Sequence, residues 1–473
     1  MPSLETLIRS KPLLTYFFLW LLFLYLGHFH EPWRDEAQAY MLAADSASLS
    51  EMLHNLRYEG HPPLWHLLLR LISKSGLSGP DALWITQATI AAGTATLWLI
   101  LCPLNFPLRL LSLFSYFFLY EYGIIARTYS LACLLWMIAL LAPPRPLRVA
   151  AALLVAFTSL YGWVLTLIYW LNLELQREGC LRTRLIFASN LALAAWLTIP
   201  SPQQDFFHPT YLSQLPRWSD LTTAITRFFS TLAPITFRWP YFWENHPHTQ
   251  IPNLLFTLLF LIILTILLRK SSRNTKILLL TSLSIFLTIS LCIYSGGYRH
   301  NGHWFLIILA LMSRDRDWLR DNLRRWTLVT IMVLSMLGGV RHLIKDIRHP
   351  FSAAPLAAEI IREELKKNPS LQLVGGIDYT VSSIAYQLGR PIYYLNRGEF
   401  GTFVKWDRHR KRSPKDIHQD LQNWITKRNA LFVFDTQFAQ PFTPLLNSCC
   451  IHIATFHAAF VLDESYEIWT LKN

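Results

Sequence analysis

Two adjacent carboxylates, Asp35 and Glu36, follow the first apolar stretch of the chain, in the sequence Trp33-Arg34-Asp35-Glu36-Ala37. A carboxylate can act as a general base toward a hydroxyl or an amine, and a second acid beside it can raise its pKa or hold a cation. Acids gathered at a membrane boundary favour chemistry on a substrate delivered by the membrane. A structural explanation also exists, because acids in the first turn of a helix favour its dipole.

A second motif, Gly60-His61-Pro62-Pro63, lies further along the same polar segment. Its prolines predict a kink before a helix, and the His61 side chain can hydrogen-bond a phosphate or help to hold a metal ion. Proline at the start of a helix is also ordinary N-terminal behaviour. For His61 the functional and structural interpretations both stay open.

Glu121, Arg127 and Tyr129 lie at the outer ends of two later apolar stretches. An arginine at such a place can neutralise the charge of a lipid phosphate that leaves during a reaction. It can also extend toward lipid headgroups without any role in chemistry. We favour the functional interpretation for this group.

A third cationic group, Arg299, His300 and His303, occurs between two apolar stretches near the end of the hydrophobic region. A phosphate or diphosphate headgroup needs a dense set of hydrogen-bond donors of this kind. Interfacial anchoring is the alternative, and the density of donors on one turn favours binding.

The composition identifies a membrane protein. Of 473 residues, 52% are hydrophobic, 14% aromatic and only 15% charged, which excludes a single soluble globule. The net charge of +13 comes mostly from short basic clusters between apolar stretches, where it indicates topology and not a nucleic-acid partner. The 6 cysteines are scattered, so neither a disulfide framework nor a zinc pattern is predicted.

The number of spans depends on residues 62–72, which are apolar but shorter than the roughly 20 residues that a membrane crossing needs. If they crossed, the later basic loops would lie outside, against the positive-inside rule. We therefore place them along the interface, with the N-terminus in the cytoplasm. The predicted spans are 12–28, 82–102, 108–122, 128–142, 149–162, 163–176, 185–200, 251–268, 277–296, 303–313 and 326–344.

This topology places every candidate group on the exoplasmic side. That side receives the loop 29–80 with two interfacial helices, the 121–127 turn, a turn at Tyr161-Gly162-Trp163, the 201–250 loop and a 297–302 turn. The topology rests on Lys and Arg positions in the other loops, so the convergence is independent of the motifs. The aromatic, His-rich part of the 201–250 loop is predicted to form a membrane-interface belt more than a sugar site.

Hydropathy falls from about residue 345, and the pattern changes to that of a soluble α/β domain. Strands are predicted near 371–377, 391–394, 430–434, 451–454 and 465–471, and helices over 380–388 and 415–427. The chain is thus divided into a mainly α transmembrane region, 1–344, and a small exoplasmic α/β domain, 345–473. The C-terminal domain has no glycine-rich nucleotide signature, so no nucleotide is assigned to it.

Taken together, the motifs resemble the GT-C class of membrane glycosyltransferases. The likeness is greatest to bacterial relatives of protein O-mannosyltransferases (family 39) and of lipid A aminoarabinose transferases. It covers about the first two hundred residues well, the later spans only in architecture, and the C-terminal domain weakly. The motifs that carry it are Trp33-Arg34-Asp35-Glu36-Ala37, Gly60-His61-Pro62-Pro63-Leu64-Trp65 and Ala126-Arg127-Thr128-Tyr129-Ser130.

The resemblance implies a sugar donor carried on a polyprenyl phosphate, a site on the exoplasmic face of the bacterial inner membrane, and an acid of the first loop near the reacting centre. Asp35 and Glu36 match that acidic pair, and Arg127 and Tyr129 match the Arg-x-Tyr turn of the family. The acceptor can be a protein, a lipid or a glycan. No second acid of the usual kind follows except Glu121, which leaves participation of a divalent cation open.

These assignments predict a single inverting displacement at the anomeric carbon. Asp35 is expected to act as general base on the acceptor, while Arg127, Arg299 and His300 offset charge on the departing phosphate. Glu36 is expected to orient Arg34 or a cation, and His61 to shape the pocket.

Two other classes of protein fit part of the pattern. Many spans with polar residues near the membrane also describe a transporter or lipid flippase. Almost no ionisable residues fall within the spans, and no paired broken helices are seen, which disfavours transport. A non-catalytic scaffold of a cell-envelope assembly can share the same fold.

Overall fold

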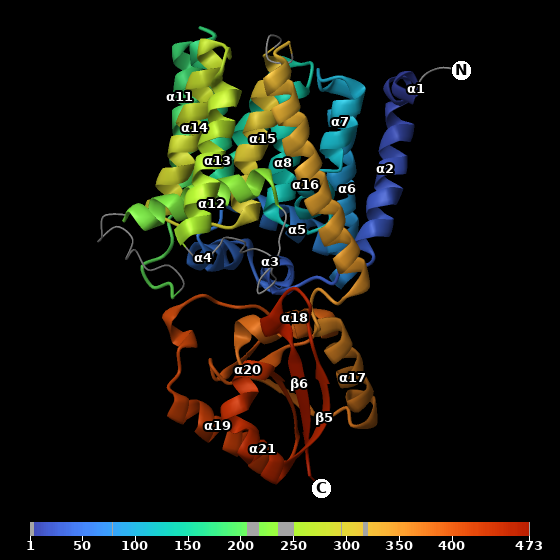
Figure 1. The fold of residues 1–473 in the computed structure, drawn as a ribbon. Helices are drawn as coiled ribbons and strands as arrows, with labels where there is room; N and C mark the ends of the chain where they lie inside the picture. The colour runs from blue at the N-terminus through green and yellow to red at the C-terminus, as the bar shows by residue number, and fades with distance from the viewer. Residues whose placement is uncertain are drawn as a thin grey trace.

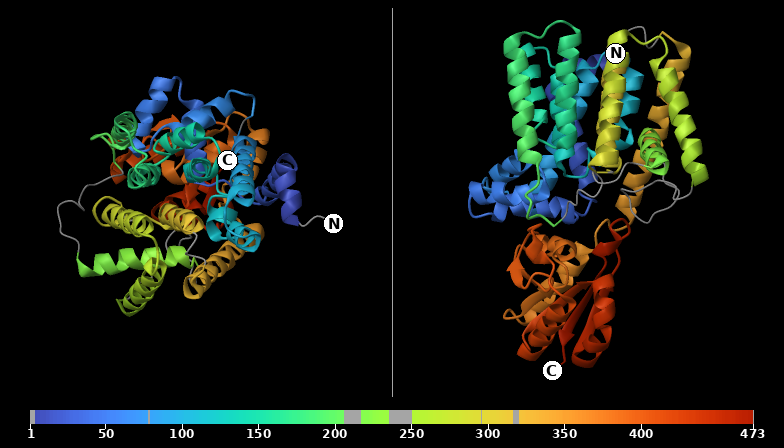
Figure 2. Two further views of the ribbon diagram at one scale, coloured as in Figure 1. Left: turned by 90° about the horizontal axis from the view of Figure 1, so that it is seen from above. Right: turned by 90° about the vertical axis from the view of Figure 1, so that its left-hand side faces the viewer.

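The computed structural model describes residues 4–77, 79–205, 217–234, 250–294, 296–315 and 320–472. A bundle of helices occupies one end of the molecule, and the C-terminal domain occupies the other (Figure 1). A layer of short helices lies between them, as the turned view in Figure 2 shows. The predicted aromatic belt lies in residues 239–248, outside the described residues.

Apolar helices form the bundle, because a helix satisfies its own backbone hydrogen bonds where water is absent. Most predicted spans correspond to one helix each, but 108–122 is divided between α7 and η1, 149–162 runs from α9 into α10, and α12 lies in the predicted 201–250 loop. Three of the described helices, α6, α14 and α16, are long and apolar enough to cross a membrane. The helices are α1 (Leu4–Ser10), α2 (Pro12–Gly27), α6 (Gly79–Leu101), α7 (Phe106–Leu113), the π-helical turn η1 (Tyr116–Glu121), α8 (Thr128–Leu141), α9 (Arg145–Val155), α10 (Leu160–Leu175), α11 (Leu181–Thr198), α12 (Trp218–Leu232), α13 (Gln250–Leu268), α14 (Arg273–Cys292), α15 (Tyr298–Arg314) and α16 (Asn322–Arg348).

The intermediate layer consists of α3 (Arg34–Asp45), α4 (Leu49–Glu59) and α5 (Leu64–Ser73). The sequence predicted two helices in this loop, and α4 is the additional one. The Ser48 hydroxyl caps α4 by accepting the Glu51 N–H at 3.1 Å, and Gly60 ends it with a φ of 65°. Ser48 and Gly60 are thus local signals for this helix that are visible in the sequence.

Two predicted turns are helical in the structure. Tyr161-Gly162-Trp163 lies inside α10, which begins at Leu160 after the Ser159 cap. Gly162 does not bend the chain there: a Cβ on it would lie 2.3 Å from the Val155 carbonyl oxygen. The 297–302 segment is not a turn either, because α15 begins at Tyr298 and carries Arg299 and His300 in its first turn.

The C-terminal domain is a sheet flanked by helices, as the sequence predicted. Its strand order is β3-β2-β1-β4-β6-β5, with β1 parallel to β2 and β4 and the other pairs antiparallel. The strands are β1 (Gln372–Gly375), β2 (Ile392–Tyr394), β3 (Glu399–Gly401), β4 (Ala430–Asp435), β5 (Cys450–Phe456) and β6 (Tyr466–Leu471). The helices are α17 (Ala354–Lys367), α18 (Asp378–Leu388), α19 (Pro414–Lys427), α20 (Thr436–Ala439) and α21 (Thr443–Cys449).

Polar contacts fasten this domain to the loop layer at α3. Arg34 pairs with Asp463 at 2.6 Å, and the Arg34 backbone N–H donates to Glu464 at 2.8 Å. The Gln38 amide exchanges two hydrogen bonds with the Val404 backbone, at 2.7 and 2.8 Å. The C-terminal domain therefore packs against the first half of α3, which carries Asp35 and Glu36.

Close packing of α15 against η1 requires glycine at position 302. A Cβ there would lie 2.3 Å from both the Phe117 ring and the Tyr122 hydroxyl, whereas one on Gly93 of α6 would meet only Leu134 at 3.4 Å. We predict that Gly302→Ala lowers the melting temperature of the detergent-purified protein, because overpacking costs about 1–3 kcal/mol. Gly93→Ala is the control and is expected to leave the melting temperature unchanged or slightly higher. Equal melting temperatures for the two variants would contradict this account of the packing.

Candidate functional site

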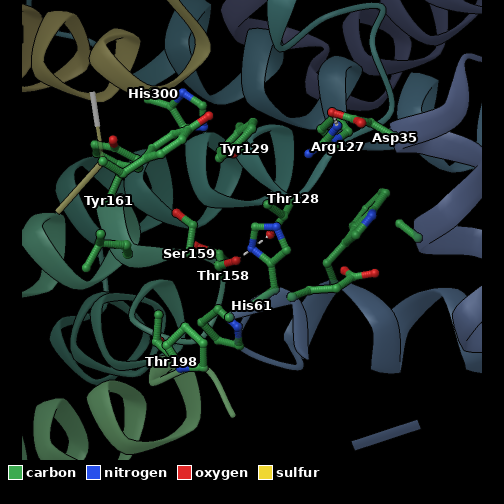
Figure 3. Close-up of a pocket in the computed structure, with 18 of the residues that line it drawn as sticks. Asp35, His61, Arg127, Thr128, Tyr129, Thr158, Ser159, Tyr161, Thr198 and His300 are labelled. Atoms are coloured by element: carbon green, nitrogen blue, oxygen red, sulfur yellow. Dashed lines mark hydrogen bonds and ion pairs between the residues drawn. The ribbon is translucent and has the colours of Figure 1, made fainter. Parts of the chain in front are cut away.

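A cavity of about 970 Å³ lies where the bundle, the loop layer and the C-terminal domain meet. Figure 3 shows part of its lining. The predicted site residues that line it are Arg34, Asp35, His61, Arg127, Tyr129, Arg299 and His300. Segments far apart in the sequence thus contribute to one cavity.

Asp35 forms ion pairs with two arginines of the bundle. It accepts a hydrogen bond from Arg127 at the N-terminal boundary of α8, and its Oδ2 lies 3.1 Å from Arg299 on α15. Both guanidinium groups also lie over the Trp33 ring, at 5.9 and 5.3 Å from its centroid. Figure 3 shows Asp35 and Arg127 facing each other.

The ion pairs set the charge state of Asp35. Burial alone would raise its pKa, but the guanidinium groups of Arg127, Arg299 and Arg34 outweigh burial and hold the pKa well below its usual range. Asp35 is therefore a carboxylate at any physiological pH, and it is a weak base. One carboxylate against two guanidinium groups leaves the cluster with an excess of positive charge.

Aromatic rings continue the wall from these arginines. Tyr129 lies 5.4 Å from His300, and His300 lies 5.1 Å from Tyr161, measured between ring centroids. The Gly297 backbone N–H donates to His300 Nδ1 at 2.8 Å. Because Nδ1 accepts that bond, a neutral His300 carries its proton on Nε2, where it is a donor.

Glu36 was predicted to orient Arg34 or a cation, and Glu121 to bind substrate, but neither residue lines the cavity. Glu36 is fully buried and accepts hydrogen bonds from the Ala126 backbone at 2.5 Å and from His30 Nε2 at 2.9 Å. Glu121 is also buried and accepts the Tyr116 hydroxyl at 2.6 Å. The geometry gives Glu36 a structural position behind Asp35 and does not place it on Arg34.

The prediction for Arg34 also needs correction in one respect. Arg34 lines the cavity, but its ion-pair partner is Asp463 of the C-terminal domain, and its guanidinium lies 5.2 Å from the centroid of Tyr379. The sequence could not indicate this contact, because Asp463 lies more than four hundred residues away. Arg34 therefore joins the loop layer to the C-terminal domain at the edge of the cavity.

Three further polar side chains of the cavity, Gln38, Glu59 and His66, belong to none of the predicted groups. Burial raises the pKa of Glu59 to about 7, while the Gln38 amide and Arg127 lower it. Burial lowers the pKa of His61 to about 4 and that of His66 to about 3, so both imidazoles are neutral at pH 7. The sequence feature that could have identified Glu59 is its position directly before the Gly60-His61 motif.

Another wall of the cavity is apolar. It is made by Leu160 of α10, Ile199 after α11, and Ile285 and Ile289 of α14. The arginine cluster and this apolar surface belong to one cavity, so the cavity suits a molecule with an anionic head and a hydrocarbon chain. Among the residues that the structure describes, no three His, Cys, Asp or Glu side chains lie close enough together to hold a metal ion.

No family model matches the sequence, and no curated protein matches it either. Among solved structures, ArnT from Cupriavidus metallidurans bound to undecaprenyl phosphate aligns over 97% of this chain and 97% of its own, with a TM-score of 0.52 and 13% identity. The chain has the fold of ArnT. The apo structure of the same protein covers 99% of this chain and 98% of its own, at 14% identity and a TM-score of 0.48. The predicted GT-C fold is confirmed, and the likeness at this identity concerns the fold.

The different surroundings of the two adjacent acids generate a prediction. We expect Glu36→Ala to lower the melting temperature, because it leaves the buried Ala126 N–H without its acceptor, at a cost of about 1–3 kcal/mol. Glu359→Ala changes an exposed acid of α17 and is the control. Thermal unfolding of the purified variants measures both, and a Glu36→Ala protein as stable as the control would contradict the structural position of Glu36.

Proposed function

We propose that this protein is a multi-pass glycosyltransferase of the bacterial inner membrane that takes a sugar from a polyprenyl-phosphate donor. The observation that carries the proposal is that Arg127, Arg299 and an apolar wall line the same cavity. The fold supports it, because the solved ArnT structure contains undecaprenyl phosphate. The N-terminus is assigned to the cytoplasm and the C-terminal domain to the periplasm from the positions of the basic loops.

The donor occupies the cavity with its phosphate at Arg127 and Arg299. Both guanidinium groups line the cavity and can donate to phosphate oxygens. The first isoprene units lie against the apolar wall between α10 and α14. The sugar then extends toward the loop layer, where His61 and Glu59 lie.

The reaction is a single displacement with inversion at the anomeric carbon. A hydroxyl or amine of the acceptor forms a bond to this carbon while the bond from the carbon to the phosphate oxygen breaks. The electron pair of that bond leaves with the phosphate, where Arg127, Arg299 and the Nε2–H of His300 stabilise the added charge. The acceptor is a protein, a lipid or a glycan, and its proton passes to a base of the cavity.

The role of Asp35 follows from its ion pairs. The sequence predicted it as the general base, and its low pKa makes it a poor acceptor of the proton. We assign it the task of holding Arg127 and Arg299 at the place where the phosphate binds. Asp35→Asn then removes turnover because the arginines lose their fixed positions.

Binding of undecaprenyl phosphate tests the donor site directly. Hydrogen bonds to charged groups contribute about 1.5–3 kcal/mol each, so Arg299→Ala is expected to weaken binding by at least tenfold. Arg57→Ala removes an exposed arginine of α4 and is the matched control. Affinity is measured by native mass spectrometry of the detergent-purified proteins, and equal affinities for the two variants would contradict the phosphate site.

Turnover tests the activity. The purified protein is incubated with a panel of polyprenyl-phosphate sugars and membrane extract as the source of acceptor, and release of polyprenyl phosphate is measured. We expect release with at least one donor and its loss in Asp35→Asn. Absence of release with every donor, together with absence of undecaprenyl phosphate binding, would favour a transporter or scaffold.

A further inference from the structure

We propose that Glu59 is the catalytic base that takes the proton of the acceptor. This inference rests on the proposed function and adds a residue to it. Glu59 is the last residue of α4 and lines the same cavity as Asp35 and Arg127. Unlike Asp35, it forms no ion pair within the described part of the chain.

Neutral groups hold the Glu59 carboxylate in place. Gln38 Nε2 donates to Glu59 Oε1 at 2.6 Å. The Gln38 amide is itself fixed, because its oxygen accepts the Val404 N–H at 2.7 Å and its nitrogen donates to the Val404 carbonyl at 2.8 Å. No described residue donates to Glu59 Oε2, so that oxygen is free to receive a proton.

The charges that face Glu59 come from two elements. Asp35 of α3 raises the pKa of Glu59, Arg127 at the start of α8 lowers it, and burial dominates both, which gives a value of about 7. The C-terminal domain approaches with the uncharged Val404 backbone. A base with a pKa near the working pH accepts a proton most effectively, and Glu59 meets this condition where Asp35 does not.

Two neutral histidines complete this side of the cavity. His61 follows Glu59 by two residues, and His66 lies in the first turn of α5. The His66 ring is buried and lines the cavity, and neither ring nitrogen has a hydrogen-bond partner among the described residues. Its pKa of about 3 keeps the ring neutral, so His66 adds no charge near Glu59.

The phosphate is assigned to Arg127 and Arg299. The sugar and the acceptor group that attacks it are assigned to the part of the cavity near Glu59 and His61 of the loop layer. In the reaction the acceptor O–H or N–H bond breaks as its oxygen or nitrogen bonds to the anomeric carbon, and the proton passes to Glu59 Oε2. The protonated Glu59 then releases this proton to water, which restores the carboxylate.

The test uses the donor that supports turnover in the wild-type protein. In the wild type, kcat is expected to rise with pH through about 7 and then to level off, because the base works when deprotonated. Glu59→Gln is expected to lower the kcat reached at high pH by about 10²–10⁴-fold and to remove the rise of kcat with pH. Glu59→Asp is expected to retain part of the rate, and Glu51→Gln, another acid of α4, is the control.

Two measurements without turnover accompany the kinetics. Glu59→Gln is expected to bind undecaprenyl phosphate as the wild type does, which shows a folded donor site. Infrared difference spectra are expected to show a protonated-carboxyl band that titrates near pH 7 in the wild type and is missing in Glu59→Gln.

Full turnover by Glu59→Gln, with the same dependence of kcat on pH as the wild type, would overturn the inference and leave the proposed function intact. An unchanged infrared band in that variant would also overturn it. If the wild type neither turns over any donor nor binds undecaprenyl phosphate, the proposed function fails, and the role of Glu59 fails with it.

Discussion

The ion pairs of Asp35 with Arg127 and Arg299 are the interaction on which the site depends. They join the loop layer to the starts of α8 and α15, where both arginine side chains are largely buried. Two guanidinium groups placed there without a counter-charge would be strongly destabilising, and one carboxylate compensates only part of their charge. The remaining positive charge makes this end of the cavity suitable for an anion.

The C-terminal domain contributes to the cavity lining and fixes the residue that holds Glu59. The contacts Arg34–Asp463 and Gln38–Val404 hold the domain over α3. The Val404 backbone orients Gln38, and Gln38 in turn orients Glu59. The domain thus fixes the hydrogen-bond donor of Glu59, and no charged group of its described residues affects the pKa of that carboxylate.

Hydropathy and basic loops were sufficient to predict the bundle, because apolar length and the positions of Lys and Arg are local properties of the sequence. The same properties placed Asp35, Arg127 and Arg299 on one face. The two turns were misassigned for a physical reason: Gly162 permits a close approach inside α10, and Gly297 precedes a helix that begins at Tyr298. A hydropathy pattern shows neither the close packing at Gly162 nor the start of the helix at Tyr298.

The separate surroundings of Asp35 and Glu36 could not be predicted, because adjacent residues of a helix point in directions about 100° apart. One carboxylate reaches the arginines, and the other reaches the buried Ala126 N–H. Glu59 was not recognised because its hydrogen-bond donor Gln38, and the Val404 backbone that fixes Gln38, lie far from it in the sequence. Sequence motifs indicate which groups meet, whereas the proton affinity of each depends on tertiary contacts.

The position of a bound lipid phosphate tests the central claim most directly. Electron cryo-microscopy of the protein with undecaprenyl phosphate is expected to show the phosphate between Arg127 and Arg299 and the chain along the wall of α10 and α14. Density for the phosphate at another place, or an empty cavity at saturating lipid, would contradict the account.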